Sequence, residues 1–283
     1  MKICRFEYKD AVRIGLVTDD ALLDLTPFGI SQLTSLLESG DPVAHLTTLA
    51  QQKVPHVPFS DVRLLAPVER QEIWAAGVTY LRSKAARMEE SDFSASAYDR
   101  VYAAERPEIF FKSLPEKVVA TGEPVGIRSD ATWNVPEPEL ALVMSSRGRI
   151  VGYTIGNDMS SRDIEGENLL YLPQAKTYHR SCALGPWIVL GMSEAAVRHW
   201  TINIDIRRDG NICFAGETTV GQIKRGFEEL AGFLFRCQNF PHGAVLLTGT
   251  GIVPPDTFTL AERDEIAISI SGVGTLKNVV VTV

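Results

Sequence analysis

The amino-acid sequence predicts an α+β, β-rich protein in which a small N-terminal domain precedes a larger main domain. The chain has 283 residues, enough to bury a sizeable core, and its 45% hydrophobic and 22% charged residues are ordinary for a globular protein. Short stretches that alternate apolar and polar residues dominate the C-terminal two-thirds and indicate strands. We therefore expect the small domain over residues 1–65 and the main domain over residues 66–283.

The first 65 residues predict three strands and one helix. The stretches KICRFEY and RIGLVTD are candidate strands on either side of a turn at Lys9 and Asp10, and ALLDLTP is a third. The spacing of apolar residues in ISQLTSLLES predicts an amphipathic helix. Prolines punctuate the next stretch, VPHVPFSDVRLLAPV, so we expect it to be a connector into the main domain.

The main domain begins with EIWAAGVTYLRSKAARMEES, which predicts a strand ending at Gly77 and a helix from about Leu81 to Glu90. The cations Arg82, Lys84 and Arg87 lie on the early turns of this helix and two glutamates lie near its end, so its charges oppose the helix dipole. Such a helix would suit a mobile lid whose cations meet an anionic ligand. A solvated basic face is the alternative.

The stretch ERPEIFFKSL predicts a strand in which Glu108, Phe110 and Lys112 share one face. A carboxylate and an ammonium would then flank an aromatic wall. The alternative is a surface strand with an ion pair between neighbouring side chains.

Two glutamates in PEPELALVM form the strongest chemical signal in the sequence. If this stretch is a strand, Glu137 and Glu139 project to the same side, and a turn at Ser145–Gly148 returns the chain along RIVGYTIGND to Asp158. Three carboxylates packed together would repel one another, whereas Mg²⁺, Mn²⁺ or Ca²⁺ would offset their charge. The alternative is an exposed strand edge that carries two solvated glutamates.

The rest of the chain predicts strands, one helix and two further candidate site residues. Lys176 is expected in a polar loop, where beside a metal it would bind an oxyanion or relay a proton; ordinary solvation is the alternative. The Asp209–Gly210 pair predicts a hairpin, IKRGFEELAGFLFRC a helix, and AISISGVGTLKNVVVTV two more strands. In TGTGIVPP no helix follows the glycines, which argues against a nucleotide loop, and we expect a tight turn with Thr250 facing the site.

The net charge, the hydropathy and the cysteines of the chain indicate which class of partner and which cellular compartment to expect. A net charge of −7 without a run of Lys or Arg argues against nucleic acid and favours a small-molecule partner. No stretch approaches about 18 consecutive apolar residues, and MKICRFEYKD lacks a signal-peptide core, so we expect neither membrane insertion nor secretion. Four scattered cysteines without a CxxC pair fit reduced thiols, and we expect a cytoplasmic protein.

Four motifs in order, PEPELALV, GYTIGNDMSSRD, LGPWIV and LLTGTGIVP, resemble the fumarylacetoacetate hydrolase family over roughly Pro67 to Val283. The resemblance implies a mixed β-roll main domain after a small N-terminal domain. It also implies assembly as a homodimer or homotetramer, and a metal held by Glu137, Glu139 and Asp158, with Mg²⁺ expected and Mn²⁺ or Ca²⁺ as alternatives.

One departure from the family pattern bears on the chemistry. Hydrolases of the family carry a His and a Glu three residues apart that activate water, and here Ser83 and Ala86 stand at these positions. By contrast GVTYLRS, RPEIFFK and YLPQAKTYHRSCALGP resemble the branch that dehydrates 2-keto-3-deoxy-pentonates such as 2-keto-3-deoxy-D-arabinonate or the xylonate, in pentose catabolism. That resemblance implies that Glu108 and Lys176 act in catalysis.

The expected function is therefore a Mg²⁺-dependent hydro-lyase that removes a C3 proton and the C4 hydroxyl and gives 2-oxoglutarate semialdehyde. We expect Arg82, Ser83, Lys112 and Thr250 to bind the substrate. Two alternatives stay open: an acylpyruvate hydrolase or 2-keto acid decarboxylase of the same family, and a non-catalytic, metal-dependent binder of keto acids.

Overall fold

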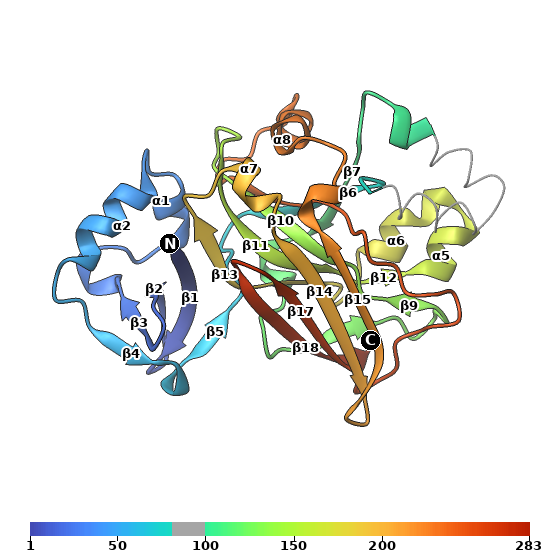
Figure 1. The fold of residues 1–283 in the computed structure, drawn as a ribbon, viewed down its shortest axis with the longest axis horizontal. Helices are drawn as coiled ribbons and strands as arrows, with labels where there is room; N and C mark the ends of the chain where they lie inside the picture. The colour runs from blue at the N-terminus through green and yellow to red at the C-terminus, as the bar shows by residue number, and fades with distance from the viewer. Residues whose placement is uncertain (81–99) are drawn as a thin grey trace.

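A computed structural model describes residues 1–80 and 100–283, and it confirms the β-rich α+β class (Figure 1). Within these ranges most elements are short strands, and the helices are shorter than three turns. None of the helices in these ranges has the length and apolar character needed to cross a lipid bilayer.

The N-terminal region forms a small sheet that is covered by two helices (Figure 1). Its elements are β1 (Lys2–Tyr8), β2 (Ala11–Val17), β3 (Ala21–Asp24), α1 (Leu33–Leu37), α2 (Pro42–Ala50), β4 (His56–Pro58) and β5 (Arg63–Leu65). Lys9 and Asp10 both have positive φ, 51° and 58°, as a tight hairpin turn requires. The expected connector was wrong, because VPHVPFSDVRLLAPV contains β4 and β5, which pair with β3 and β1.

The main sheet continues this small sheet without a break, because β1 pairs with β13. Its strand order is β4-β3-β2-β1-β13-β11-β10-β16-β6-β7, with β5 paired to β1. β16 and β6 are parallel, and the other neighbouring strands of the main sheet are antiparallel, so the sheet is mixed. The strands beyond β1 are β13 (Cys182–Leu190), β11 (Ile150–Asp158), β10 (Pro138–Met144), β16 (Ala244–Leu247), β6 (Glu72–Gly77) and β7 (Glu108–Ser113).

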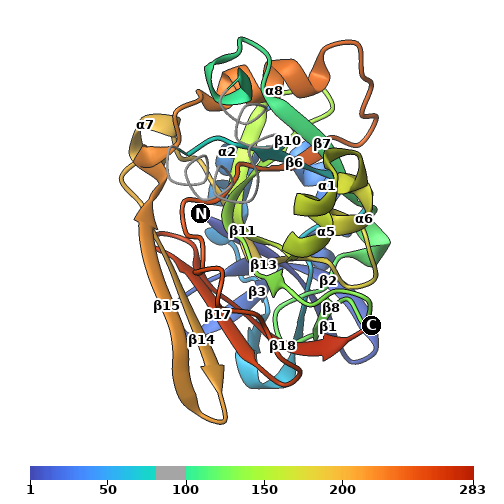
Figure 2. The same cartoon turned by 90° about the vertical axis from the view of Figure 1, so that its right-hand side faces the viewer.

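A second sheet lies beside the main sheet (Figures 1 and 2). Its order is β15 (Asn211–Thr219), β14 (Thr201–Arg208), β17 (Glu265–Ile270), β18 (Gly274–Thr282) and β8 (Val125–Ile127), and β9 (Asn134–Val135) pairs separately with β12 (Ser160–Ser161). The other helices are α5 (Arg162–Glu167), α6 (Leu172–Lys176), α7 (Glu194–Val197) and α8 (Phe227–Phe235). Single 3₁₀ turns lie at Thr26–Phe28, Phe59–Asp61, Pro115–Lys117, Leu169–Tyr171 and Val220–Gln222.

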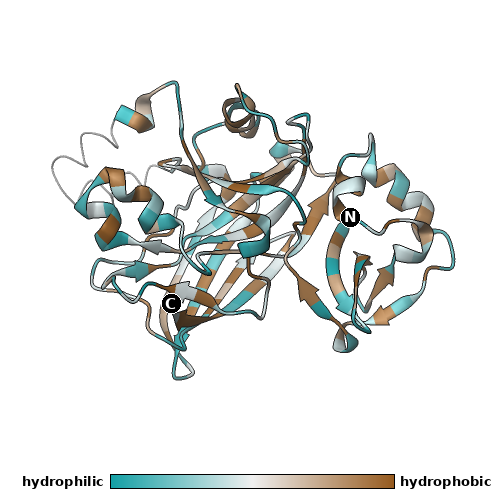
Figure 3. Cartoon of the chain, turned by 180° about the vertical axis from the view of Figure 1, so that it is seen from behind, coloured by the Kyte–Doolittle hydropathy of each residue, from teal (hydrophilic) through white to brown (hydrophobic). Residues whose placement is uncertain are grey.

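β10 is buried on both faces and separates two hydrophobic clusters. Hydrophobic residues, drawn in brown, recur along the strands (Figure 3). Leu140 and Leu142 belong to the cluster between the two sheets, which includes Ile204 of β14. Ala141 and Val143 face the other cluster, which reaches the N-terminal region. The ends of β10 and of its neighbour β11 are therefore held rigidly, which matters for the side chains that they carry.

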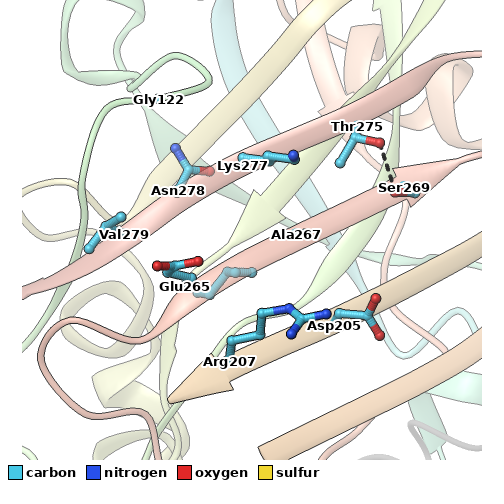
Figure 4. A pocket seen from close by; sticks show the side chains of 11 residues that line it. Gly122, Asp205, Arg207, Glu265, Ala267, Ser269, Thr275, Lys277, Asn278 and Val279 are labelled. Atoms are coloured by element: carbon cyan, nitrogen blue, oxygen red, sulfur yellow. Dashed lines mark hydrogen bonds between the residues drawn. The ribbon is translucent and has the colours of Figure 1, made fainter. Parts of the chain in front are cut away.

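The outer face of the second sheet carries a hollow of about 490 Å³ (Figure 4). Asp205, Arg207, Glu265 and Lys277 are among the residues that line it, and so are Ser269 and Thr275, whose hydroxyls are hydrogen-bonded to each other at 2.9 Å between β17 and β18. Side chains alternate along these strands, so the hollow lies on the opposite side of the sheet from the core. It is thus separate from the carboxylates of β10 and β11.

Candidate metal centre and active site

Three buried carboxylates meet where β10 begins and β11 ends. Glu137 immediately precedes β10, Glu139 is its second residue, and Asp158 is the last residue of β11. The strands pair antiparallel with Pro138 opposite Asn157, so their ends lie side by side. One oxygen from each carboxylate lies within 4.8 Å of the others, and the residues are only 3%, 1% and 1% exposed. This burial excludes the alternative of an exposed strand edge with solvated glutamates.

Lys176 places its ammonium directly on this cluster. Its Nζ lies 2.9 Å from Oε2 of Glu137, 3.2 Å from Oδ2 of Asp158 and 2.6 Å from the hydroxyl of Ser160. The expectation of a polar loop was wrong, because Lys176 is the last residue of α6 and has no exposed surface. Its solvation as a surface lysine is excluded for the same reason.

Arg162 supplies a second cation that the sequence reasoning missed. It is the first residue of α5, is 2% exposed, and one guanidinium nitrogen lies 2.8 Å from Oε1 of Glu137. Its position four residues after Asp158, where a strand turns into a helix, was a signal available in the sequence.

Glu139 has a different set of partners. Its Oε2 accepts a hydrogen bond of 2.5 Å from the backbone N–H of Gly249, and among the described residues it forms no ion pair within 4.0 Å. Burial, and then the charges of Asp158 and Glu137, raise the pKa of Glu139 well above its usual value. A divalent cation would offset this concentration of negative charge, and three carboxylates are hard ligands of the kind that Mg²⁺ and Mn²⁺ prefer. The donor set therefore fits such an ion.

A cavity of about 10 Å³ lies against the cluster, with room for roughly one water molecule. Glu137 and Asp158 line it together with Arg162, Lys176 and Thr250. Phe110 and residues 76–78 also line it. Two carboxylates and two cations thus converge on one small space.

Glu108 reaches this region from β7. It is paired across the sheet with Gly77, which lines the cavity, and a Cβ atom on Gly77 would lie only 2.0 Å from Oε2 of Glu108. Its carboxylate therefore occupies space that exists because residue 77 has no side chain. Glu108 and the buried Glu165 also line a neighbouring, largely apolar pocket of about 300 Å³.

The remaining candidate residues differ in their placement. Thr250 lines the cavity, and its hydroxyl is bonded to the backbone of Ile252 at 3.1 and 3.2 Å. Lys112 is fully buried beside Asp158 and does not contribute to the described lining of the cavity. Arg82 and Ser83, and the helix expected from about Leu81 to Glu90, lie outside the described residues.

The sequence of the chain matches two family descriptions. Residues 72–281 match "Fumarylacetoacetate (FAA) hydrolase C-terminal", and residues 1–67 match "Rv2993c-like, N-terminal". The chain belongs to the fumarylacetoacetate hydrolase family. This confirms the family that the four sequence motifs indicated.

Within the fumarylacetoacetate hydrolase family, two curated relatives share high identity with the chain. It is 42% identical over 276 residues to a probable 2-keto-3-deoxyxylonate dehydratase of Haloferax volcanii, with 97% of this chain and 94% of the relative covered. It is 41% identical over 221 residues to 2-dehydro-3-deoxy-D-arabinonate dehydratase of Saccharolobus solfataricus, with 77% and 74% covered.

A solved structure of the same family is similar over the whole chain. It is 2-keto-3-deoxy-D-arabinonate dehydratase complexed with magnesium and 2,5-dioxopentanoate, with a TM-score of 0.82, 33% identity, and 100% of this chain and 99% of that chain covered. The mixed, β-rich fold expected for the main domain is confirmed by this similarity.

Proposed function

We propose that this protein is a divalent-metal-dependent dehydratase that converts a 2-keto-3-deoxy-pentonate, the arabinonate or the xylonate, to 2-oxoglutarate semialdehyde, which is also called 2,5-dioxopentanoate. The observation that carries the proposal is the buried cluster of Glu137, Glu139 and Asp158 against the ammonium of Lys176. The names of the relatives and the ligands of the similar structure support the substrate class.

In this proposal Glu137, Glu139 and Asp158 hold the metal, Mg²⁺ in the first instance. A bound divalent cation polarises the ketone of a 2-keto acid and makes its C3 protons more acidic. Arg162 and Lys176 line the same cavity and carry positive charge, which suits a carboxylate substrate and a developing enolate. Arg82, Ser83 and Thr250 remain proposed substrate contacts.

Two residues are candidates for moving protons. Either Glu108, which packs against Gly77, takes the proton from C3 and the Lys176 ammonium protonates the leaving C4 hydroxyl, or Lys176 acts as a neutral amine that takes the C3 proton and Glu108, in its protonated form, supplies the proton to the hydroxyl. The net result of these proton transfers is the loss of one water molecule from the substrate, and the resulting enol then tautomerises to the 2-keto aldehyde. No carbon–carbon bond breaks in these steps.

The two alternative functions, a hydrolase or decarboxylase and a non-catalytic keto-acid binder, would require different groups in the site. A hydrolase or decarboxylase must break a carbon–carbon bond, and the family's water-activating pair is replaced by Ser83 and Ala86. A non-catalytic binder would need the metal centre but no group that transfers a proton, so it does not account for a lysine held within 3.2 Å of two of the carboxylates.

The test is an assay of the purified protein with Mg²⁺ and a panel of 2-keto-3-deoxy acids and acylpyruvates. We expect a five-carbon product that carries a new aldehyde, identified by mass and by trapping with a carbonyl reagent. Pyruvate plus a shorter acid, formed from acylpyruvates at comparable rates, would overturn the dehydratase in favour of the hydrolase. Mg²⁺-dependent binding of keto acids without turnover of any of them would favour the binder.

The close contact between Gly77 and Glu108 leads to a second expected result. In Gly77→Ala the new methyl group would displace the Glu108 carboxylate, and the fold should survive because the displaced atoms end a flexible side chain. We expect kcat to fall on the order of 10²-fold, as misplacement of a reacting group by about 1 Å can cause. Steady-state kinetics and a thermal melt check this, with Gly40→Ala as control because nothing lies within 4 Å of a Cβ there. Wild-type kcat in Gly77→Ala would show that the position of Glu108 is unimportant.

A further inference from the structure

Lys112 has an unusual environment for a lysine. It lies near the end of β7 and has no exposed surface. Its Nζ is 2.5 Å from Oδ1 of Asp158, 3.0 Å from the backbone oxygen of Met159, and hydrogen-bonded to the backbone oxygen of Lys176. Two of the three N–H donors of the ammonium are hydrogen-bonded to these two backbone oxygens, and the contact with Asp158 is an ion pair.

The three partners belong to different segments of the chain. Asp158 is the last residue of β11 and Met159 follows it, while the carbonyl of Lys176 is at the last residue of α6. The last carbonyls of a helix have no partner within the helix, and Lys112 satisfies one of them here. Lys112 therefore joins β7, β11 and α6 at one point.

This arrangement divides the two oxygens of Asp158 between two lysines. Lys112 contacts Oδ1, and Lys176, which lines the cavity, contacts Oδ2 at 3.2 Å. The Asp158 carboxylate is thus fixed in rotation, and the backbone from which Lys176 projects is fixed by the same ammonium. The Lys112 ammonium also balances part of the negative charge of the carboxylates without occupying the cavity.

We propose that Lys112 is a positioning residue, which orients Asp158 towards the cavity and holds Lys176 in place. This role replaces the one expected from the sequence, in which Lys112 binds the substrate. The proposal rests on the proposed metal centre and on Lys176 as a reacting group. Groups that orient metal ligands in this way typically change metal affinity or activity 10- to 100-fold when they are replaced.

The experiment compares Lys112→Met and Lys112→Gln with the wild-type protein and with Lys277→Met, a control on the exposed outer face of the second sheet. Titration calorimetry measures Mg²⁺ binding without substrate, and steady-state kinetics at saturating Mg²⁺ measure kcat and KM. We expect Mg²⁺ to bind about 10- to 100-fold more weakly and kcat to fall by at least about 10-fold. KM should stay within about threefold, because Lys112 is fully buried and is not part of the described cavity lining that would contact the substrate.

Three results would overturn the proposal. Unchanged Mg²⁺ affinity with a raised KM would assign Lys112 to the substrate. A lower melting temperature with unchanged Mg²⁺ affinity and kcat would leave it a structural role only. If neither variant folds, a crystal structure of the wild-type protein with Mg²⁺ and the semialdehyde decides: Nζ still on Met159 and Lys176 supports the proposal, and Nζ on the semialdehyde refutes it. Failure of the wild-type protein to bind Mg²⁺ would instead count against the metal centre itself.

Discussion

Replacing Lys176 with methionine is expected to lower kcat on the order of 10²-fold or more, the range typical of groups that transfer protons. The ammonium lies within 3.2 Å of both Glu137 and Asp158 and lines the cavity, so methionine would keep much of the side-chain volume and remove the only charge of that residue. Initial rates over a range of substrate concentrations separate kcat from KM.

The controls for this variant address its folding. Removing one member of a buried ion pair can cost about 3–5 kcal/mol of stability, so circular dichroism and a thermal melt should accompany the kinetics, with and without Mg²⁺. Lys117→Met is the matched control, because Lys117 is exposed. Glu108→Gln should show a loss of similar size, and near-wild-type turnover in both variants would mean that neither residue carries the chemistry.

Removal of the divalent metal is expected to abolish activity, because in the proposed mechanism the keto acid is activated only when it is bound to the cation. Extensive treatment with a chelator should reduce turnover to background. Mg²⁺ or Mn²⁺ should restore the rate, and Zn²⁺ should do so poorly, since an all-oxygen site suits harder ions. Full turnover by thoroughly chelated protein would contradict this expectation.

The same requirement can be tested on the protein side. Glu139→Ala should weaken Mg²⁺ binding in calorimetry and lower kcat/KM on the order of 10²-fold or more, because it deletes one of the three carboxylates. Glu116→Ala, which alters an exposed glutamate, is the control. Mg²⁺ affinity equal to that of the wild-type protein would remove Glu139 from the proposed centre.

Local rules were sufficient to predict the hairpin that carries the carboxylates. The period of two places Glu137 and Glu139 on one side, and the turn before Arg149 fixes the return of the chain to Asp158, so both follow from neighbouring residues. The turn at Lys9 and Asp10 is local in the same sense. The start of α2 was missed although Asp41 accepts a hydrogen bond from the backbone N–H of Ala44, a pattern that marks helix N-termini.

Contacts between distant segments could not be predicted in this way. Lys176 becomes buried because α6 packs near β7 and β12, and nothing in its flanking residues indicates these neighbours. Lys112 was placed on the correct strand, but its partners are 46, 47 and 64 residues away in the sequence. The pairing of β5 with β1 is another long-range contact, which the prolines around β5 concealed.

The shared hydrophobic cluster has a consequence for how such proteins can recombine. Ile3 and Leu33 of the N-terminal region pack in one cluster with Val143 and Leu184 of the main sheet. The first 65 residues therefore act as one half of a matched interface, and a chimera with another N-terminal region would need apolar side chains of the same size at these contacts. A substitution at these contacts in one region therefore requires a compensating substitution in the other. β10 and β11, which carry the carboxylate cluster at their ends, belong to the same sheet as this interface.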